Sequence, residues 1–395
     1  MKVIVFILAI VLISSTVGAQ TYLDSTVNSA TKRIQFANAN QFSIGSYGEA
    51  HYNQKIDDGT FQNGKVDLHR VILFMGYKFN KNLQFFAEIE FEHVAEVYVE
   101  QAFINYSVNS AFNVKAGVIL IPIGYVNEFH EPTLFNGVER PNVAKYVIPT
   151  TWREMGVGFH GLVKQMNIKY QAYMVNGFKS YDGSSKLSGS SGLRSARQKA
   201  ANAIFRTPSF TGKVSFYGLN GLRLGLSGYY GNTETTLYNG LERNDQLAVG
   251  TADSTIVGVG MVAMNAHYRI ANFQLTAVGS YTKLSNTGAF NSYTSSDVGK
   301  EIFGYYAEVA YRQKIKSGQS FPQLIPFVRY ENYDTHYAVE GGTMRNASYH
   351  REELTAGVGF QITPGTIIKA DYQWVKNEAN PKPYSVLNIG FGYWF

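Results

Sequence analysis

Three glutamates at alternate positions are the first residues whose spacing indicates a function. Glu88, Glu90 and Glu92 lie two residues apart, so in an extended strand their side chains fall on one face. Glu96 and Glu100 follow along the chain. A row of carboxylates on a channel wall repels anions and favours cations. These glutamates are therefore candidates for a charged lining.

The segment 122–152 and the residues just after it mix charges of both signs. The charged side chains there are Glu128, Glu131, Glu139, Arg140, Lys145, Arg153 and Glu154. Acids and bases that face each other across a narrow passage set up a transverse field, which orders water and sorts solutes by size and dipole. Pro132, Pro141 and Pro149 stiffen the segment. The same charges could instead form salt bridges to a wall, and the sequence leaves both interpretations open.

A third group of charges is basic and lies in the segment 177–211. Between Lys179 and Lys213 it contains Lys186, Arg194, Arg197, Lys199 and Arg206. Residues 192–205 are expected to form one short helix that presents Arg194 and Arg197 together. Such a basic vestibule would concentrate anions within about 8 Å at physiological salt. The alternative is that these exposed cations bind anionic sugars of an outer leaflet.

Motifs of enzymes and cofactor sites do not occur in the sequence. It has no Gly-x-Ser-x-Gly elbow, the segment 130–132 lacks the second histidine of a zinc helix, and the segment 258–260 lacks the third glycine of a nucleotide loop. There is no cysteine, and the 8 histidines show no convincing ligand spacing. We expect no enzyme, no cofactor and no metal site.

The glutamate row belongs to an alternating pattern that predicts β-strands. Leu83, Phe85, Ala87, Ile89 and Phe91 fall on the face opposite the glutamates. The pattern recurs at residues 114–118, 328–331 and 371–375. Each such strand has one apolar and one polar side. Alternation alone also suits a soluble β-sandwich, so the connections between strands must discriminate.

The connections alternate between a short and a long kind. The short ones are at residues 80–82, 109–111, 164–166, 220–221, 271–272 and 363–365, with a longer member at 316–323. The long, polar ones are at 55–64, 122–152, 177–211, 233–255, 285–301, 334–350 and 377–384, with one short member near Val94. This sorting predicts an all-β transmembrane antiparallel barrel of about sixteen strands, with short periplasmic turns and long extracellular loops. A barrel of this size leaves an aqueous lumen.

Composition and the chain ends agree with a barrel. The chain has 14% aromatic and only 16% charged residues, and its net charge of +6 is spread too thinly to indicate a nucleic-acid partner. Residues 1–19 have the pattern of a signal peptide cleaved after Ala19, which leaves a lead at 20–41 before a barrel at 42–395. The last residues alternate to a terminal Phe395, which resembles the insertion signal of outer-membrane barrels.

The segment 117–124 resembles the Gly-x4-Pro-x-Gly signature of the phosphate-selective porin O and P family. Residues 127–132, 140–141 and 148–154 look like a branch of that family, and residues 67–71 are similar to its second-strand pattern. The resemblance implies a sixteen-stranded trimeric porin whose third long loop folds inward around 122–152. Phosphate selectivity does not follow, because Leu120 stands where a basic residue is common.

The sequence thus predicts a porin in the outer membrane of a Gram-negative bacterium, through which small hydrophilic solutes or ions diffuse passively. The candidates for the pore lining and constriction are Arg70, Glu88, Glu90, Glu92, Glu128, Glu131, Arg140, Lys145 and Arg153. The expected partners are outer-membrane lipid, lipopolysaccharide, the solutes and two further copies in a homotrimer. The alternatives are an anion-selective or phosphate-selective porin and a barrel that acts in surface binding or adhesion.

Overall fold

The structure, a computed structural model, describes residues 41–57, 59–242, 244–316 and 318–395. The predicted signal peptide and nearly all of the predicted lead lie outside these residues. In the described part of the chain, no helix is both long enough and apolar enough to cross a bilayer.

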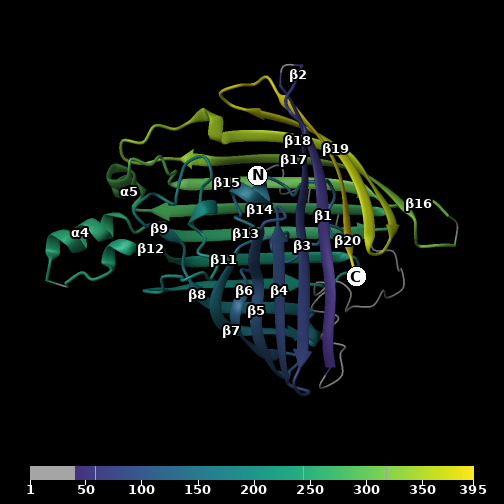
Figure 1. Ribbon diagram of the computed structural model, residues 1–395, viewed down its shortest axis with the longest axis horizontal. Helices are drawn as coiled ribbons and strands as arrows, with labels where there is room; N and C mark the ends of the chain where they lie inside the picture. The colour runs from purple at the N-terminus through teal and green to yellow at the C-terminus, as the bar shows by residue number, and fades with distance from the viewer. Residues whose placement is uncertain (1–40, 58, 243, 317) are drawn as a thin grey trace.

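Sixteen long antiparallel strands form one closed wall, which confirms the predicted fold class (Figure 1). Each strand pairs with its neighbours along the chain, and the first pairs with the last from Tyr47 opposite Trp394 to Ile56 opposite Ser385. The strands are β1 (Gln41–Asp57), β3 (Lys65–Lys78), β4 (Leu83–Glu92), β5 (Glu96–Asn109), β6 (Phe112–Leu120), β7 (Arg153–Val163), β8 (Ile168–Asn176), β10 (Pro208–Phe216), β11 (Leu222–Asn232), β13 (Gly258–Ile270), β14 (Phe273–Ser285), β15 (Glu301–Tyr311), β17 (Gln323–Ala338), β18 (His350–Thr363), β19 (Thr366–Asn377) and β20 (Tyr384–Trp394).

Short and long connections lie at opposite ends of the barrel, as the sequence predicts. We call these the turn end and the loop end. The third loop (residues 121–152) contains α3 (Val143–Tyr146), and the sixth (286–300) contains α5 (Thr287–Thr294). The fourth loop (177–207) and the fifth (233–257) are joined by the parallel pair β9 (Lys179–Tyr181) and β12 (Glu234–Thr235), and the fifth also contains α4 (Gln246–Ser254). The small strands β2 (Thr60–Phe61) and β16 (Gln313–Lys314) extend the edges of β1 and β17.

The helix expected at residues 192–205 is wrong. The structure has only a single 3-10 turn there, Arg194–Ala196. Lys199, Ala200 and Asn202 have positive φ values of 55°, 58° and 46°, which a right-handed helix cannot contain. The backbone N–H of Gln198 instead donates to the Glu154 carboxylate at 3.1 Å, so a tertiary contact replaces the helical hydrogen bonds.

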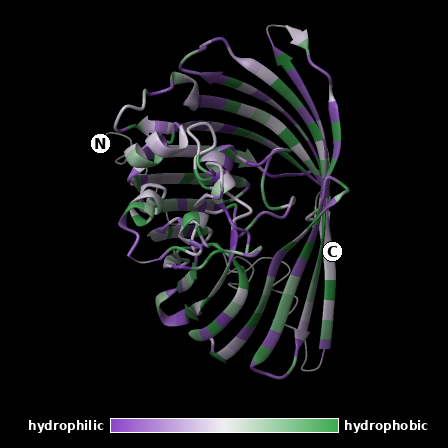
Figure 2. Ribbon diagram, turned by 60° about the vertical axis from the view of Figure 1, so that its left-hand side comes forward, coloured by the Kyte–Doolittle hydropathy of each residue, from purple (hydrophilic) through white to green (hydrophobic). Residues whose placement is uncertain are grey.

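Side chains alternate across the wall, with apolar groups outside and polar groups inside. In β10, Phe210 is 54% exposed whereas Ser209 is fully buried. In β20, Phe391 is 51% exposed and Asn388 is fully buried. Figure 2 shows bands of high and low hydropathy alternating along the strands. An exposed apolar outer surface is unfavourable in water and suits a lipid environment.

The hydrophobic core lies inside the barrel, because loops fill much of the lumen. Figure 2 shows loop segments lying between the flanks of the wall. The Trp152 ring of the third loop stacks on Phe178 of the fourth loop with ring centroids 4.4 Å apart, and packs at a tilt against Tyr229 of β11 at 4.9 Å. These rings belong to one buried cluster that continues through both loops and the wall. The loops are therefore packed parts of the fold.

Candidate functional site

The third loop is closed at its base by a single asparagine. The Asn127 amide donates to the carbonyl of Ile121 at 2.7 Å and to that of Trp152 at 2.9 Å. Its side-chain oxygen accepts from the Trp152 backbone N–H at 2.9 Å. These three bonds hold both ends of the loop together, so the loop enters the lumen as one unit.

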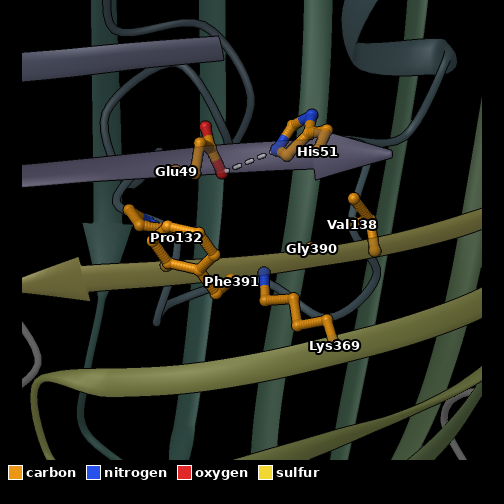
Figure 3. A pocket seen from close by; sticks show the side chains of 8 residues that line it. Glu49, His51, Pro132, Val138, Lys369, Gly390 and Phe391 are labelled. Atoms are coloured by element: carbon orange, nitrogen blue, oxygen red, sulfur yellow. Dashed lines mark ion pairs between the residues drawn. The ribbon is translucent and has the colours of Figure 1, made fainter. Parts of the chain in front are cut away.

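A buried arginine of β3 holds the middle of this loop. The fully buried Arg70 donates from Nε to the Glu49 carboxylate of β1 at 2.6 Å, and from Nη2 to the backbone carbonyl of His130 at 2.6 Å. The His130 ring in turn lies 2.9 Å from the hydroxyl of Tyr47. Figure 3 shows the same side of the lumen, where Pro132 of the loop lies close to Glu49. We call these contacts the first anchor.

A second buried arginine, in β17, forms the second anchor on another part of the wall. Arg329 lies 3.0 Å from the Glu331 carboxylate and 3.4 Å from that of Glu308. It also donates to the carbonyls of Asn136 at 3.2 Å and Glu139 at 3.4 Å. On β19, two strands along the wall, side chains bind further loop backbone: Lys369 donates to the carbonyl of Phe135 at 2.9 Å, and Asp371 accepts from the N–H of Val138 at 2.6 Å.

The third anchor is a lysine of β10. Lys213 donates to the carbonyl of Gly124 and lies 2.6 Å from the Glu128 carboxylate, which also accepts from Gln171 at 2.6 Å. Burial would raise the pKa of Glu128, but Lys213 and Lys169 lower it to about 2, so the carboxylate is charged. In the ring order of strands, the anchors at β3, β10 and β17 are spread around the barrel. The loop thus crosses the lumen and narrows it from several sides.

The structure places the predicted glutamate row on the inner face but covers most of it. Glu88 is 1% exposed and Glu90 is 2% exposed, while Glu92 is half-buried. Gln101 donates to Glu88 at 2.8 Å. Arg153 lies 3.6 Å from Glu100, so it neutralises part of this acidic group from the start of β7. That these glutamates line the path of the ions stays a prediction.

The remaining candidates of the third loop lie near the first anchor or at the surface. Arg140 is 3.9 Å from Glu49, and Glu131 is buried. Glu139 accepts hydrogen bonds from His51 at 3.1 Å and from Asn53 at 3.0 Å. Burial would raise the pKa of Glu139, but the hydrogen bond and charge of His51 lower it to about 2. Lys145 is exposed, with its ammonium 5.5 Å from the Tyr146 ring.

The structure brings Arg194 and Arg197 of the fourth loop together on the third loop. Both guanidinium groups donate to the carbonyl of Thr150, and Arg197 also donates to the hydroxyl of Thr151 at 2.8 Å. The other three candidates make separate contacts, which are Lys186 with Asp182 at 2.7 Å, Lys199 over the Tyr98 ring at 4.7 Å and Arg206 over the Tyr238 ring at 3.3 Å. The two loops are therefore joined through Arg194 and Arg197 of the fourth loop.

A group of basic side chains near the turn end was missed by the sequence analysis. It consists of Lys115, His160, Lys169, Lys213, Arg223, His267 and Arg269 on successive strands from β6 to β13, with Arg312 in the turn after β15. We call it the basic arc. Each strand contributes only one or two of these residues, so no local run of charge marks them. The sequence signal for them is alternation, because within each strand they occupy the same alternate positions as the polar residues of the inner face.

Like charges in the basic arc outnumber the carboxylates near them. Arg223 is 9% exposed, and its Nε and Nη1 have no hydrogen-bond partner among the described residues. Its guanidinium lies 4.7 Å from the Phe129 ring of the third loop. Burial and then the charge of Arg269 lower the pKa of Arg312 to about 10. Such an arrangement attracts anions, because an anion relieves the repulsion between the cations.

Solved structures of outer-membrane channels have the same fold. The anion-selective porin from Comamonas acidovorans matches with a TM-score of 0.57 and 12% identity, over 90% of this chain and 99% of that one. The outer-membrane channel DcaP of Acinetobacter baumannii matches with a TM-score of 0.59 and 13% identity, over 90% and 97%. Pseudomonas putida OprB matches with a TM-score of 0.54 and 12% identity, over 90% and 94%. At these identities the likeness establishes a porin-type barrel and nothing finer.

Comparison of sequences gives one informative relative. No family model matches the chain. A protein of Aquifex aeolicus (strain VF5), described as uncharacterized, is 32% identical over 347 residues, which span 84% of this chain and 74% of that protein. The chain therefore belongs to one family with this Aquifex aeolicus protein.

Proposed function

We propose that the protein is an outer-membrane channel for the passive diffusion of small hydrophilic solutes. The observation that carries the proposal is the third loop, which is anchored inside a closed barrel with a polar inner face. Such a loop narrows the lumen without any moving part, so solutes are sorted by size and charge and no chemical step is needed. The likeness to porins and outer-membrane channels supports the same conclusion.

A preference for anions is the more specific proposal, and the basic arc supports it. Solutes that pass the third loop meet the arc near the turn end, where Lys169 and Arg312 are half-buried and Arg269 is exposed, whereas the glutamates at 88, 90 and 100 are covered. The predicted repulsion of anions by the glutamate row therefore carries less weight than the arc. The motif at 117–124 supports membership of the phosphate-selective porin O and P family, and the cations of the basic arc suit an oxyanion.

The location and assembly of the chain are part of the proposal. The apolar outer surface and the alternation that ends at Phe395 support insertion into the outer membrane after cleavage at Ala19. We infer a homotrimer in contact with lipopolysaccharide, as a trimer form is described for OmpT of Vibrio cholerae. The likeness to porins and outer-membrane channels supports a role without catalysis.

Single-channel recording in planar bilayers tests the function. The refolded mature chain should give stepwise conductance, and in a salt gradient the reversal potential should favour anions. A variant with Lys169→Gln and Arg223→Gln should lose that preference, whereas the control Lys382→Gln, at an exposed position of the last loop, should keep it. Block by low phosphate would favour the phosphate-selective form. A folded barrel without conductance would overturn the channel proposal and favour a binding or adhesive barrel.

A further inference from the structure

Three side chains that can bind a metal ion converge at the loop end of the barrel. His93 Nδ1, in the connection between β4 and β5, lies 2.7 Å from Asp67 Oδ2 of β3. His69 Nδ1, also on β3, lies 3.4 Å from the same oxygen. One ligand atom from each residue falls within 4.8 Å of the others. The side chains are 24% to 48% exposed, so an ion can reach them from water.

An irregularity in β3 brings His69 into this cluster. Glu49 of β1 is opposite Arg70, but His51 is opposite Asp67, so β3 has one extra residue between these pairs. A β-bulge of this kind re-aims side chains locally. As a result, the His69 ring stacks on His51 with centroids 4.7 Å apart, close to the Glu49 and Arg70 pair of the first anchor. The cluster therefore lies at the mouth of the lumen.

An unusual turn holds His93 against β3. His93 and Val94 have φ values of 52° and 67°, and a positive φ is a clear outlier for a β-branched residue such as valine. Glycine or asparagine is the usual choice at these positions of a tight hairpin. The backbone N–H of His93 donates to the carbonyl of His69 at 3.3 Å. Strain of this kind is maintained where the direction of a side chain matters.

The chemistry of the donors selects the class of ion. Two imidazoles and one carboxylate suit zinc and similar transition-metal dications, whereas calcium and magnesium prefer oxygen ligands alone. Zinc bonds of about 2.0–2.1 Å at tetrahedral angles place ligand atoms about 3.3 Å apart. The 3.4 Å separation of His69 and Asp67 already has this value. We propose that Asp67, His69 and His93 bind a divalent transition-metal ion, with zinc as the representative.

The surroundings leave room for a further ligand. Glu92 Oε1 lies 4.0 Å from His93 Nε2, which is not the nitrogen that faces Asp67, so a water molecule rather than this carboxylate would complete the coordination. The competing interpretation is that the bond between Asp67 and His93 only closes the hairpin. That role needs one imidazole, whereas the cluster contains two. The metal proposal does not depend on whether the barrel conducts ions.

Calorimetric titration of the folded mature chain with zinc chloride tests the site. We expect one saturable zinc site per chain and no comparable binding of calcium or magnesium. His69→Gln and His93→Gln should each weaken zinc binding at least about tenfold, since loss of even an indirect support of a metal site costs this much. His350→Gln is the matched control, because His350 also contacts an acid at the loop end, Glu378 at 2.9 Å, and should not change binding.

X-ray absorption of the zinc-loaded wild-type chain gives a readout that needs no variant to fold. We expect a coordination shell of nitrogen and oxygen with two imidazoles. A shell without two imidazoles would overturn the proposal, as would unchanged zinc affinity in folded His69→Gln and His93→Gln. Absence of saturable binding to the folded wild-type chain would overturn it equally.

Discussion

The third loop should detach from β3 when Arg70 is replaced by methionine. Arg70 makes two charged hydrogen bonds of 2.6 Å, to Glu49 and to the carbonyl of His130, each worth about 1.5–3 kcal/mol. Removing one partner of a buried pair costs about 3–5 kcal/mol. His51 at 3.5 Å and Arg140 at 3.9 Å still compensate Glu49, so we expect a value near the lower limit, about 3 kcal/mol. This shifts the docking of the loop about a hundredfold toward the free state.

Two measurements report loop docking in the Arg70→Met variant. Single-channel recordings should show a larger and noisier conductance, because a loosened loop narrows the lumen less. Trypsin should cleave faster after Lys145, which lies in the loop. Arg312→Met is the matched control for the cleavage assay, since Arg312 is also a lumen arginine, but its side chain hydrogen-bonds, among the described residues, to the wall glutamines Gln274, Gln323 and Gln361 and not to the third loop.

Unchanged conductance and unchanged cleavage in a folded Arg70→Met barrel would refute the reasoning. The loop would then be held by its other anchors, and Arg70 would only stabilise the wall. Equal effects of Arg70→Met and Arg312→Met on cleavage would also refute it, because the change would then reflect the lost charge in general.

Three further predictions concern pH, charge and backbone. Burial lowers the pKa of His130 to about 4, so the docked third loop holds this ring neutral. Docking is therefore fully stable above pH 6.5 and loses about 3 kcal/mol as the pH falls from 6.5 to 4. Tryptic cleavage measured against pH should show this loss, and His130→Asn should remove it. Lys169→Gln alone should lower the anion-to-cation permeability ratio, measured as a reversal potential, by less than the double variant does. Gly117→Ala should lower the melting temperature of the barrel, because Gly117 has φ of +133° and a Cβ there would lie 2.2 Å from the Ala102 carbonyl; an unchanged thermal transition would contradict this.

The fold could be predicted because its signals are local. Alternation with period two and the sorting of connections by length need no knowledge of distant contacts, and both agree with the structure. Residues 192–205 show where this fails. Their composition allows a helix, but the bond from Gln198 to Glu154 and three positive φ values override the local preference.

The candidate site was predictable only in its charges. Arg70 binds the backbone of His130, and Arg329 binds that of Asn136 from much further along the chain. A sequence shows that these residues are charged, but it does not show which carbonyl each will meet. The same holds for Asp67 and His93, which meet only because β3 and β4 are paired.

Because β1 pairs with β20, closure of the barrel depends on the strand that is synthesised last. No intermediate that lacks β20 can close, so β1 and β19 would each present an unpaired backbone edge until the last strand arrives. Unpaired backbone groups are not tolerated in the hydrocarbon of a bilayer. A chain truncated before β20 should therefore fail to form a closed barrel, and its two unpaired edges would be open to pairing with other proteins. One missing strand would convert a sealed cylinder into a template for aggregation.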